Sequence, residues 1–308
     1  MTQKKRPHSP SIDSLPRGQA LARYTAARLG GPADYLYIAK DPSYSDLIPL
    51  LDQAWKRQTP VTVIGGGANV LVADAGIRGL TIINRATDIS HEDDGDEAFV
   101  TASSGTSLIR LARYCQEHGL KGMEWAIAVP GTVGGAVVNN AGAHGGDVAS
   151  SLTRALVLEA AGGERWYDAD ELDYAYRHSQ LKARADKRFF IKHACFQLER
   201  DNPELIQKRM EQNNDYRRRT QPAGASLGSI FKNPLGDFAG RLVEAAGLKG
   251  ARVGSVQVSP VHANFFINSG DAASARDYYQ LICLVRERVK EAFDLTLELE
   301  IQLLGEWD

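Results

Sequence analysis

Apolar and polar positions along the chain follow patterns that predict both helices and strands. Apolar residues recur at helical spacing over 47–55 and over 108–115. For the second of these helices we expect Thr106 as the N-cap and Gly119 just past the end. Short apolar runs predict strands at 61–64 (expected to be buried), 99–103, 154–160 and 189–196. From residue 20 onward, strands and helices are therefore expected to alternate.

The last third of the chain has its own pattern. Asn202 and Pro203 are typical of an N-cap and a first helical position, so a long polar helix is expected to run towards Arg219. A further helix is predicted over 271–293, with apolar side chains on one side. Over 295–304, Leu and Ile alternate with polar residues, which predicts a half-buried strand packed under that helix.

Length and pattern together predict several units. The chain has 308 residues, about two domains at roughly 150 residues each. We expect a disordered N-terminal arm, two lobes and a C-terminal domain whose first element is the Asn202 helix. The expected bounds are 1–20 for the arm, 21–85 and 86–201 for the lobes, and 202–308 for the C-terminal domain.

Charge and composition exclude several classes of protein. The 36 Lys and Arg residues nearly balance 38 Asp and Glu, so a nucleic-acid or membrane-surface binder with a broad basic face is not expected. No apolar run is long enough to span a bilayer, and the basic N-terminus lacks the apolar core of a secretory signal. The 3 cysteines are far apart, which predicts buried thiols in a reducing cytosol.

Two glycine-rich segments are the strongest candidates for chemistry. Residues 122–146 hold seven of the 29 glycines, and Gly65, Gly66 and Gly67 end the predicted strand at 61–64. Because glycine costs conformational entropy, such density predicts that another group approaches the backbone closely. The N–H groups of both loops are expected to bind a pyrophosphate from two sides. For either loop alone, a simple tight turn stays open as the alternative.

Common ligand-binding motifs do not fit these loops. A Rossmann fingerprint starting at Gly65 needs glycine where Val70 stands, and Arg85 occupies the region of its acidic residue. No glycine cluster ends in the Gly-Lys-Ser/Thr of a P-loop. The histidines lack the spacing of a catalytic metal site, so no metal is expected.

A series of short motifs spans roughly residues 22–306 in a characteristic order. They are RLGGPAD (28–34), GGGANVL (65–71), VPGTVGGA (129–136) with NAGA (140–143), YRHS (176–179), GSIFKNP (228–234), GLKG (247–250), VSPVHANF (258–265) and EIQLLG (300–305). As a set they resemble the UDP-N-acetylenolpyruvoylglucosamine reductases, the MurB family, in the shorter subtype without an extra tyrosine-bearing loop. The chain departs from the family pattern at Ala128-Val129-Pro130, where Gly-Ile-Pro is usual, and at Asn139 and His144, where Met and Tyr are usual.

The resemblance implies an α+β fold and an enzymatic activity. The two lobes are expected to form a bipartite FAD-binding unit of the vanillyl-alcohol-oxidase type over about 28–197, followed by a substrate domain. NADPH is expected to reduce FAD, which then reduces an enolpyruvyl ether to give UDP-N-acetylmuramate for peptidoglycan synthesis. A cytoplasmic location and no obligate protein partner are expected. The alternatives are an oxidase of the same flavin fold and a non-catalytic flavin or nucleotide-sugar binding protein.

The resemblance also implies catalytic residues. Arg177 is expected to stabilise the charge that develops on the substrate's carboxylate, since a guanidinium is permanently charged. Ser229 is expected to donate the proton to C2, and Glu300 to assist that step. Glu298 lies on the same face of the predicted strand as Glu300, so only the family's spacing to Gly305 favours Glu300.

Cofactor and substrate residues follow from the same motifs. Lys232 and Asn233 precede a helix expected around Asp237 and are expected to bind the pyrophosphate of the UDP group. His262 and Asn264 are weaker substrate-side candidates, and a structural role for the histidine is equally favoured. The residues expected to bind FAD are Gly65, Gly66, Gly67, Ala68, Asn69, Val70, Leu71, Pro130, Gly131, Thr132, Gly134, Gly135, Asn140 and Gly142.

Overall fold

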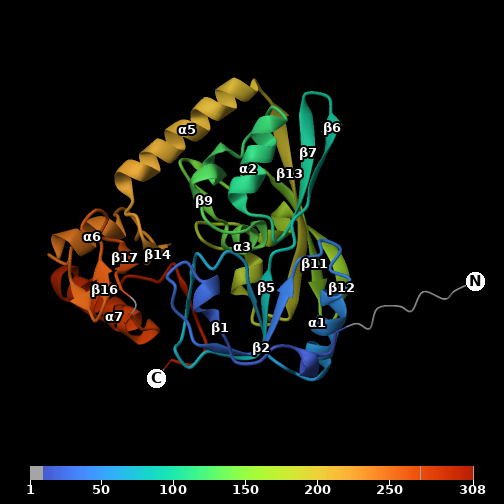
Figure 1. Cartoon of the computed structure of the whole chain (residues 1–308). Coiled ribbons are helices and arrows are strands. Elements are labelled where there is room, and N and C mark those ends of the chain that lie inside the picture. The colour runs from blue at the N-terminus through green and yellow to red at the C-terminus, as the bar shows by residue number, and fades with distance from the viewer. Residues whose placement is uncertain (1–9, 271, 308) are drawn as a thin grey trace, which may run out of the picture.

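The computed structural model describes residues 10–270 and 272–307, which form two lobes and a C-terminal unit (Figure 1). Residues 1–9 of the expected arm lie outside the described residues. The rest of the arm is not disordered. Ile12, in the 3-10 turn Ile12–Ser14, is only 2% exposed, and β1 (Gln19–Ala20) pairs with β2. A buried apolar side chain and a strand pairing therefore fix residues 10–20 to the first lobe.

The first lobe is a four-stranded sheet in the order β1-β2-β5-β3, with β2 and β3 parallel to β5. Helix α1 (Leu47–Lys56) buries Leu47, Leu50, Leu51, Ala54 and Trp55, which confirms the apolar face predicted for it. Leu158 and Phe190 of the second lobe join the same core. The other elements are β2 (Pro32–Ala39), β3 (Val61–Ile64), β4 (Val70–Val72), β5 (Ile77–Asn84) and a 3-10 helix at Leu21–Tyr24.

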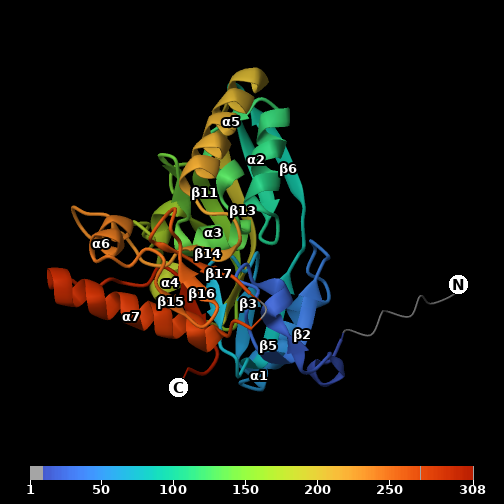
Figure 2. The same cartoon turned by 60° about the vertical axis from the view of Figure 1, so that its left-hand side comes forward.

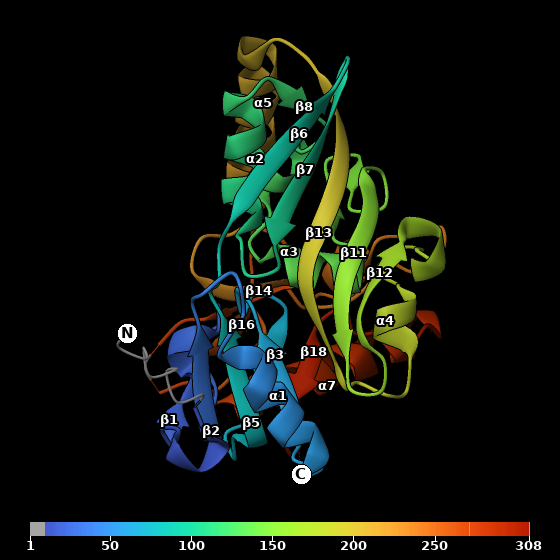
Figure 3. The same ribbon diagram turned by 90° about the vertical axis from the view of Figure 1, so that its right-hand side faces the viewer.

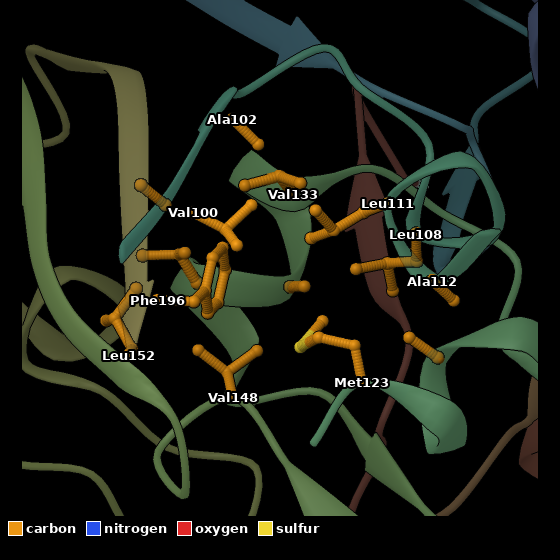
Figure 4. Close-up of a cluster of buried hydrophobic side chains, with 14 of the residues drawn as sticks. Val100, Ala102, Leu108, Leu111, Ala112, Met123, Val133, Val148, Leu152 and Phe196 are labelled. Atoms are coloured by element: carbon orange, nitrogen blue, oxygen red, sulfur yellow. The ribbon is translucent and has the colours of Figure 1, made fainter. Parts of the chain in front are cut away.

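The second lobe is an antiparallel sheet in the order β12-β11-β13-β7-β6, seen face-on in Figure 3, with β8 paired to the end of β13. The strands predicted in this region are confirmed. Its core lies between the sheet and helices α2 and α3, where Phe196 and Val100 meet Val133 (Figure 4). The elements are β6 (Ile89–Asp94), β7 (Glu97–Ser103), α2 (Leu108–Glu117), β8 (Leu120–Lys121), α3 (Val133–Asn139), β9 (Gly142–Ala143), β10 (Gly146–Asp147), β11 (Leu152–Glu159), β12 (Gly163–Asp168), α4 (Gln180–Ala183) and β13 (Phe189–Arg200), with 3-10 helices at Glu124–Ala128 and Ala169–Leu172.

The N-cap of α2 is Ser107 rather than Thr106. The Ser107 hydroxyl accepts a hydrogen bond from the Arg110 N–H group at 3.2 Å. Thr106 is fully buried, and its hydroxyl donates to the carbonyl of Asp88 at 3.2 Å. The Thr106 hydroxyl is thus bound outside the helix, and the Leu108 N–H group, the first of the helix, donates to the carbonyl of Gly131. Gly119, with φ of 67°, follows the helix end as expected.

Helix α5 (Pro203–Thr220) begins as the sequence predicts. The side chain of Asn202 accepts a hydrogen bond from the Glu204 N–H group at 2.8 Å. Ile206 and Met210 lie in the core of the second lobe, and the helix then leads to the C-terminal unit (Figures 1 and 2). By packing, α5 therefore belongs with the second lobe, and a domain division at residue 202 stays a prediction.

The C-terminal unit is an antiparallel sheet in the order β14-β17-β16-β15, packed against α7 (Ala275–Phe293). Helix α7 starts at residue 275 rather than 271 because Ser274 and Asp277 form a capping box. The Asp74 carboxylate of the first lobe accepts hydrogen bonds at 2.9 Å from the first N–H groups of α7, so the helix is fixed to that lobe. The other elements are β14 (Ala225–Ser229), α6 (Ala239–Ala245), β15 (Arg252–Val253), β16 (Val256–Val258), β17 (Phe265–Asn268) and β18 (Gln302–Leu304).

The continuous strand predicted over 295–304 is wrong. Only 302–304 forms a strand, β18, and it pairs in parallel with β4 of the first lobe. The expected packing is confirmed, because Leu297 and Ile301 are buried in the core that includes α7, and Leu295, Leu299 and Leu303 pack against it. Further upstream, Leu299 forms an isolated bridge with Phe231. The run therefore crosses from the C-terminal unit to the first lobe, and its backbone pairs with two different segments.

Two burial expectations also fail. Strand β3 buries only Ile64, and Val63 is 39% exposed. Cys115 and Cys195 are buried as expected, but Cys283 on α7 is exposed. Burial raises the pKa of the Cys115 thiol to about 12. Across the described residues, every helix is too short or too polar to cross a bilayer.

Candidate functional site

The two glycine-rich loops lie directly against each other. A Cβ on Gly65 would collide with the hydroxyl of Thr132, and one on Gly66 would lie 2.9 Å from the Cα of Gly131. Thr132 is the N-cap of α3, so the first loop packs against the start of that helix. The glycines are thus needed in part because one loop approaches the other, a contact that sequence reasoning did not predict.

The first loop also presents free backbone donors. Among the described residues, none accepts a hydrogen bond from the N–H groups of residues 65–69. Most of these residues are half-buried. Clustered N–H groups without protein acceptors are suited to an anion. The loop pair therefore fits the pyrophosphate of a flavin nucleotide.

Several predicted cofactor residues have a second, structural task. Gly67, with φ of 65°, lies so close to the carbonyl of Tyr24 that a Cβ would collide with it. Val70 and Leu71 belong to β4, whose backbone pairs with β18, and Leu71 is 1% exposed. Asn69 donates to the backbone carbonyl of Glu300 at 3.1 Å. This part of the loop therefore anchors the C-terminal segment.

The segment 174–179 is fixed to the C-terminal end of α3. The hydroxyl of Tyr174 donates to the carbonyl of Val137 at 3.0 Å, and that of Ser179 donates to Val138 at 2.6 Å. The side chain of Asn140 donates back to the carbonyl of Ala175 at 3.1 Å. The last carbonyls of a helix have no partner within it, so these hydroxyls supply the missing donors.

Arg177 lies at the centre of the site. Its Nε donates to Oε1 of Glu300 at 2.6 Å. Its Nη1 and Nη2 donate to the carbonyls of Asn140 at 3.3 Å and Gly142 at 3.0 Å. The side chains of Arg177 and Glu300 are 21% and 15% exposed. One guanidinium therefore joins the second glycine segment to the C-terminal unit.

The structure distinguishes Glu300 from Glu298, which periodicity alone did not. Glu298 is 76% exposed and forms an ion pair with Lys232 at 3.2 Å. Glu300 instead forms the half-buried pair with Arg177. Of the two carboxylates, Glu300 is therefore the one that contacts the catalytic candidate Arg177, whereas Glu298 contacts the substrate candidate Lys232.

Ser229 ends β14 next to Glu300. A β-bulge lies between Ser226 and Ser229, and Gly228 has φ of 75°, which turns the strand at this point. The carbonyl of Ile230 accepts a hydrogen bond from the Glu300 N–H group at 2.8 Å. Within the described part of the chain, the side-chain hydrogen bonds of the site do not use the Ser229 hydroxyl. The hydroxyl thus stays free of these bonds, on a fixed backbone.

The remaining substrate candidates differ in placement. Asn233 accepts a hydrogen bond from the Ala239 N–H group at 3.1 Å, at the start of α6, which opens at Ala239 rather than around Asp237. The Asn264 side chain is buried and binds both backbone groups of Phe231, so it supports the segment that carries Ser229. His262 accepts from the Asn264 N–H group at 3.2 Å, a structural contact.

Sequence reasoning did not single out Lys182. Its ammonium donates to the backbone carbonyl of Arg177 at 3.0 Å. The only signal in the sequence is a lysine five positions after Arg177 at the start of a short helix. A lysine in such a place is usually solvated, so the contact becomes visible only in three dimensions.

Comparisons with known proteins agree with this arrangement. Residues 37–169 match the model of an FAD binding domain, and residues 220–304 match that of the UDP-N-acetylenolpyruvoylglucosamine reductase C-terminal domain. The reductase of Bacillus pumilus (strain SAFR-032) is 40% identical over 296 residues, 96% of this chain and 95% of the relative. That of Bacillus subtilis (strain 168) is 40% identical over 290 residues, 93% of each chain. The crystal structure of MurB from Thermus caldophilus superposes with a TM-score of 0.77 at 32% identity, covering 94% of this chain and 99% of the other.

Fold and site together define a flavin-dependent oxidoreductase with an FAD-binding domain and a separate C-terminal domain. More narrowly, the chain belongs to the UDP-N-acetylenolpyruvoylglucosamine reductase family. It is an FAD-dependent oxidoreductase that acts on UDP-N-acetylenolpyruvoylglucosamine. The expected fold class, α+β with a bipartite FAD-binding unit before a second domain, is confirmed.

Proposed function

We propose that this enzyme takes its electrons from NADPH and forms UDP-N-acetylmuramate for peptidoglycan precursor synthesis in the cytoplasm. The observation that supports this most is the ion pair of Arg177 and Glu300. It lies beside the second glycine segment, and in the folded chain Glu300 is next to the end of β14, where Ser229 lies. An anion-stabilising group and a hydroxyl close to a flavin loop are what reduction of an enolpyruvyl acid requires.

The FAD would be held by the two glycine loops. The N–H groups of 65–69 would face its pyrophosphate, and the second loop packs against them at Gly131 and Thr132. When bound and reduced by NADPH, the flavin would supply the hydride that is added to C3 of the enolpyruvyl group. We propose that the flavin is bound without a covalent link. His144, which is exposed on the second segment, is the side chain that would form such a link if the flavin were bound covalently.

Arg177 would hold the carboxylate of the substrate. Its contacts with Glu300, Asn140 and Gly142 use one N–H group on each nitrogen. One N–H group therefore remains on each of Nη1 and Nη2, and a parallel pair of donors suits a carboxylate. The contacts that fix the guanidinium also reduce the entropy lost when the substrate binds.

Ser229 would deliver the proton to C2. A serine hydroxyl is a weak acid, so it must be held close to a strongly basic carbon. The bulge at Gly228 and the backbone contact between Ile230 and Glu300 provide that fixed position. Glu300, whose side chain touches Arg177, would orient the guanidinium and assist the proton transfer.

Lys232 and Asn233 would bind the diphosphate of the UDP-sugar. The Lys232 ammonium pairs with an exposed carboxylate, that of Glu298, which a diphosphate would readily replace. Asn233 keeps its amide N–H groups for a ligand, because its contact with Ala239 uses the oxygen. His262 and Asn264 would support the position of these residues from the side away from the diphosphate. No protein partner is invoked for the reaction.

An anaerobic absorbance experiment tests the function. The protein is reconstituted with FAD, NADPH is added until the flavin band is bleached, and UDP-N-acetyl-3-O-(1-carboxyvinyl)glucosamine is then added. We expect the band to return in stoichiometric amount, and the flavin to stay in solution after acid precipitation of the protein. Return of the band only on admission of oxygen would instead support an oxidase, and a flavin that precipitates with the protein would show a covalent link.

A further inference from the structure

Lys182 is held at both ends beside the site. It lies in α4, and its backbone N–H group donates to the hydroxyl of Ser179 at 3.1 Å. Ser179 is fully buried and donates in turn to the carbonyl of Val138 in α3. At the other end, the Lys182 ammonium donates to the carbonyl of Arg177 at 3.0 Å. The half-buried side chain is therefore directed at one backbone group.

That backbone group belongs to a strained turn. Arg177 has φ of 55°, in the left-handed region that a residue with a Cβ seldom adopts. Ala175 and His178 close the turn with backbone hydrogen bonds of 3.0 and 3.4 Å. A residue held in such a conformation needs support from its surroundings. The bond from an ammonium to the Arg177 carbonyl is charge-assisted, and it fixes the direction of the peptide that follows Arg177.

The charges around Lys182 favour an anionic ligand. Burial lowers the pKa of Lys182, and the cations Lys232 and Arg177 lower it further, while Glu300 raises it. The cations Lys182, Lys232 and Arg177 thus outnumber the two carboxylates of this cluster, Glu300 and the Glu298 that pairs with Lys232. An ammonium with two unused N–H groups, close to these cations, adds to the positive field in which a carboxylate and a diphosphate would bind.

We propose that Lys182 is a positioning residue for reduction of the enolpyruvyl substrate: it holds the left-handed turn that directs the Arg177 guanidinium at Glu300 and at the substrate carboxylate. The inference rests on the proposed function, in which Arg177 binds that carboxylate. Lys182 acts through Arg177 and need not touch the reacting atoms.

The test separates the two half-reactions in anaerobic stopped-flow absorbance. For Lys182→Met we expect flavin reoxidation by UDP-N-acetyl-3-O-(1-carboxyvinyl)glucosamine to slow roughly 10- to 100-fold, as misplacement by about 1 Å can cost. Flavin reduction by NADPH should stay within about twofold. Lys182→Arg, which keeps a charged donor, should recover most of the loss. Lys121→Met removes an ammonium paired with Glu199 on an exposed surface and should leave both half-reactions unchanged.

A double-mutant cycle distinguishes positioning from an independent role. In an Arg177→Ala background, Lys182→Met should cost less than about threefold, because residues that act as one unit are not additive. If Lys182→Met slowed flavin reoxidation as much in that background as in the unsubstituted protein, the proposal would be overturned. An unchanged reoxidation rate for Lys182→Met alone would overturn it too. If Lys182→Met fails to bind FAD, Lys182→Gln is used in its place, and the same slowing of reoxidation is expected. If Arg177→Ala itself leaves reoxidation unchanged, the proposed function of Arg177 fails instead.

Discussion

The guanidinium of Arg177 donates from Nε to Oε1 of Glu300 at 2.6 Å, although 123 positions separate the two residues in the chain. Arg177 comes from a turn of the second lobe, and Glu300 precedes β18, which joins the first lobe. The pair therefore connects all three units of the molecule at one point. Any change in how the C-terminal unit sits on the lobes would alter this distance.

Removing the carboxylate should weaken both stability and activity. Glu300→Gln leaves the half-buried Arg177 without its counter-ion, which is expected to cost about 1–3 kcal/mol of unfolding free energy. Reoxidation of the flavin by the substrate should slow at least about tenfold, because the guanidinium is no longer held in place. Urea unfolding and stopped-flow absorbance measure the two effects.

Glu298→Gln is the matched control for stability. Its ion pair with Lys232 is exposed, so its loss should change the unfolding free energy by less than about 1 kcal/mol. Equal destabilisation by both substitutions would contradict the distinction between the two carboxylates.

Local patterns made part of the fold predictable. The apolar faces of α1 and α2 follow from i, i+3 and i+4 spacing, which depends on neighbours in sequence alone. The choice between Thr106 and Ser107 as the N-cap did not follow from the sequence, because both residue types cap well. In the structure the Thr106 hydroxyl binds the carbonyl of Asp88, and Ser107 caps the helix. The alternation over 295–304 showed an extended run but not its two partners, Phe231 and β4.

The site was predictable only through its motifs. Arg177, Ser229 and Glu300 were reached by resemblance, and nothing in the spacing of the chain shows that Arg177 meets Glu300. Lys182 could not be found in this way. Its contact depends on the left-handed backbone of Arg177, a conformation that the sequence does not reveal at a residue other than glycine or asparagine.

Substitution in the first glycine loop should weaken FAD binding. In Gly65→Ala the new Cβ would collide with the Thr132 hydroxyl and separate the two loops. We expect the affinity for FAD, measured by flavin fluorescence, to fall at least about tenfold, or about 1.4 kcal/mol. Gly162→Ala is the control, since its Cβ would make only an ordinary contact, 3.5 Å from the Glu159 carboxylate. Unchanged FAD affinity in Gly65→Ala would show that the loop contact does not shape the flavin site.

Lys232→Ala should act on substrate binding. A diphosphate is present in the ground state and the transition state alike, so loss of its partner should raise KM and leave kcat nearly unchanged. Steady-state kinetics at saturating NADPH measure both constants. A fall in kcat with KM unchanged would assign Lys232 to the chemical step.

Acid should destabilise the protein partly through His262. Burial lowers the pKa of His262 in the folded state, and its ring nitrogen accepts a hydrogen bond from Asn264 that a protonated ring would lose. The unfolded chain therefore takes up a proton first as pH falls through about 6.5, and stability is lost in that direction. In His262→Gln, the unfolding free energy should fall less steeply between about pH 7 and 5.5. A slope equal to that of the unsubstituted protein would refute this.

The central claim, that Ser229 supplies the proton of the second half-reaction, is tested most directly by Ser229→Ala in anaerobic stopped-flow absorbance. Bleaching of the flavin by NADPH needs no proton at C2 of the sugar substrate, so its rate should stay within about twofold. Reoxidation by UDP-N-acetyl-3-O-(1-carboxyvinyl)glucosamine should slow by roughly 10²–10⁴, as loss of a positioned general acid does, and Ser229→Cys should restore part of it. Equal slowing of both half-reactions, or of neither, would contradict the assignment and transfer the role of proton donor to Glu300.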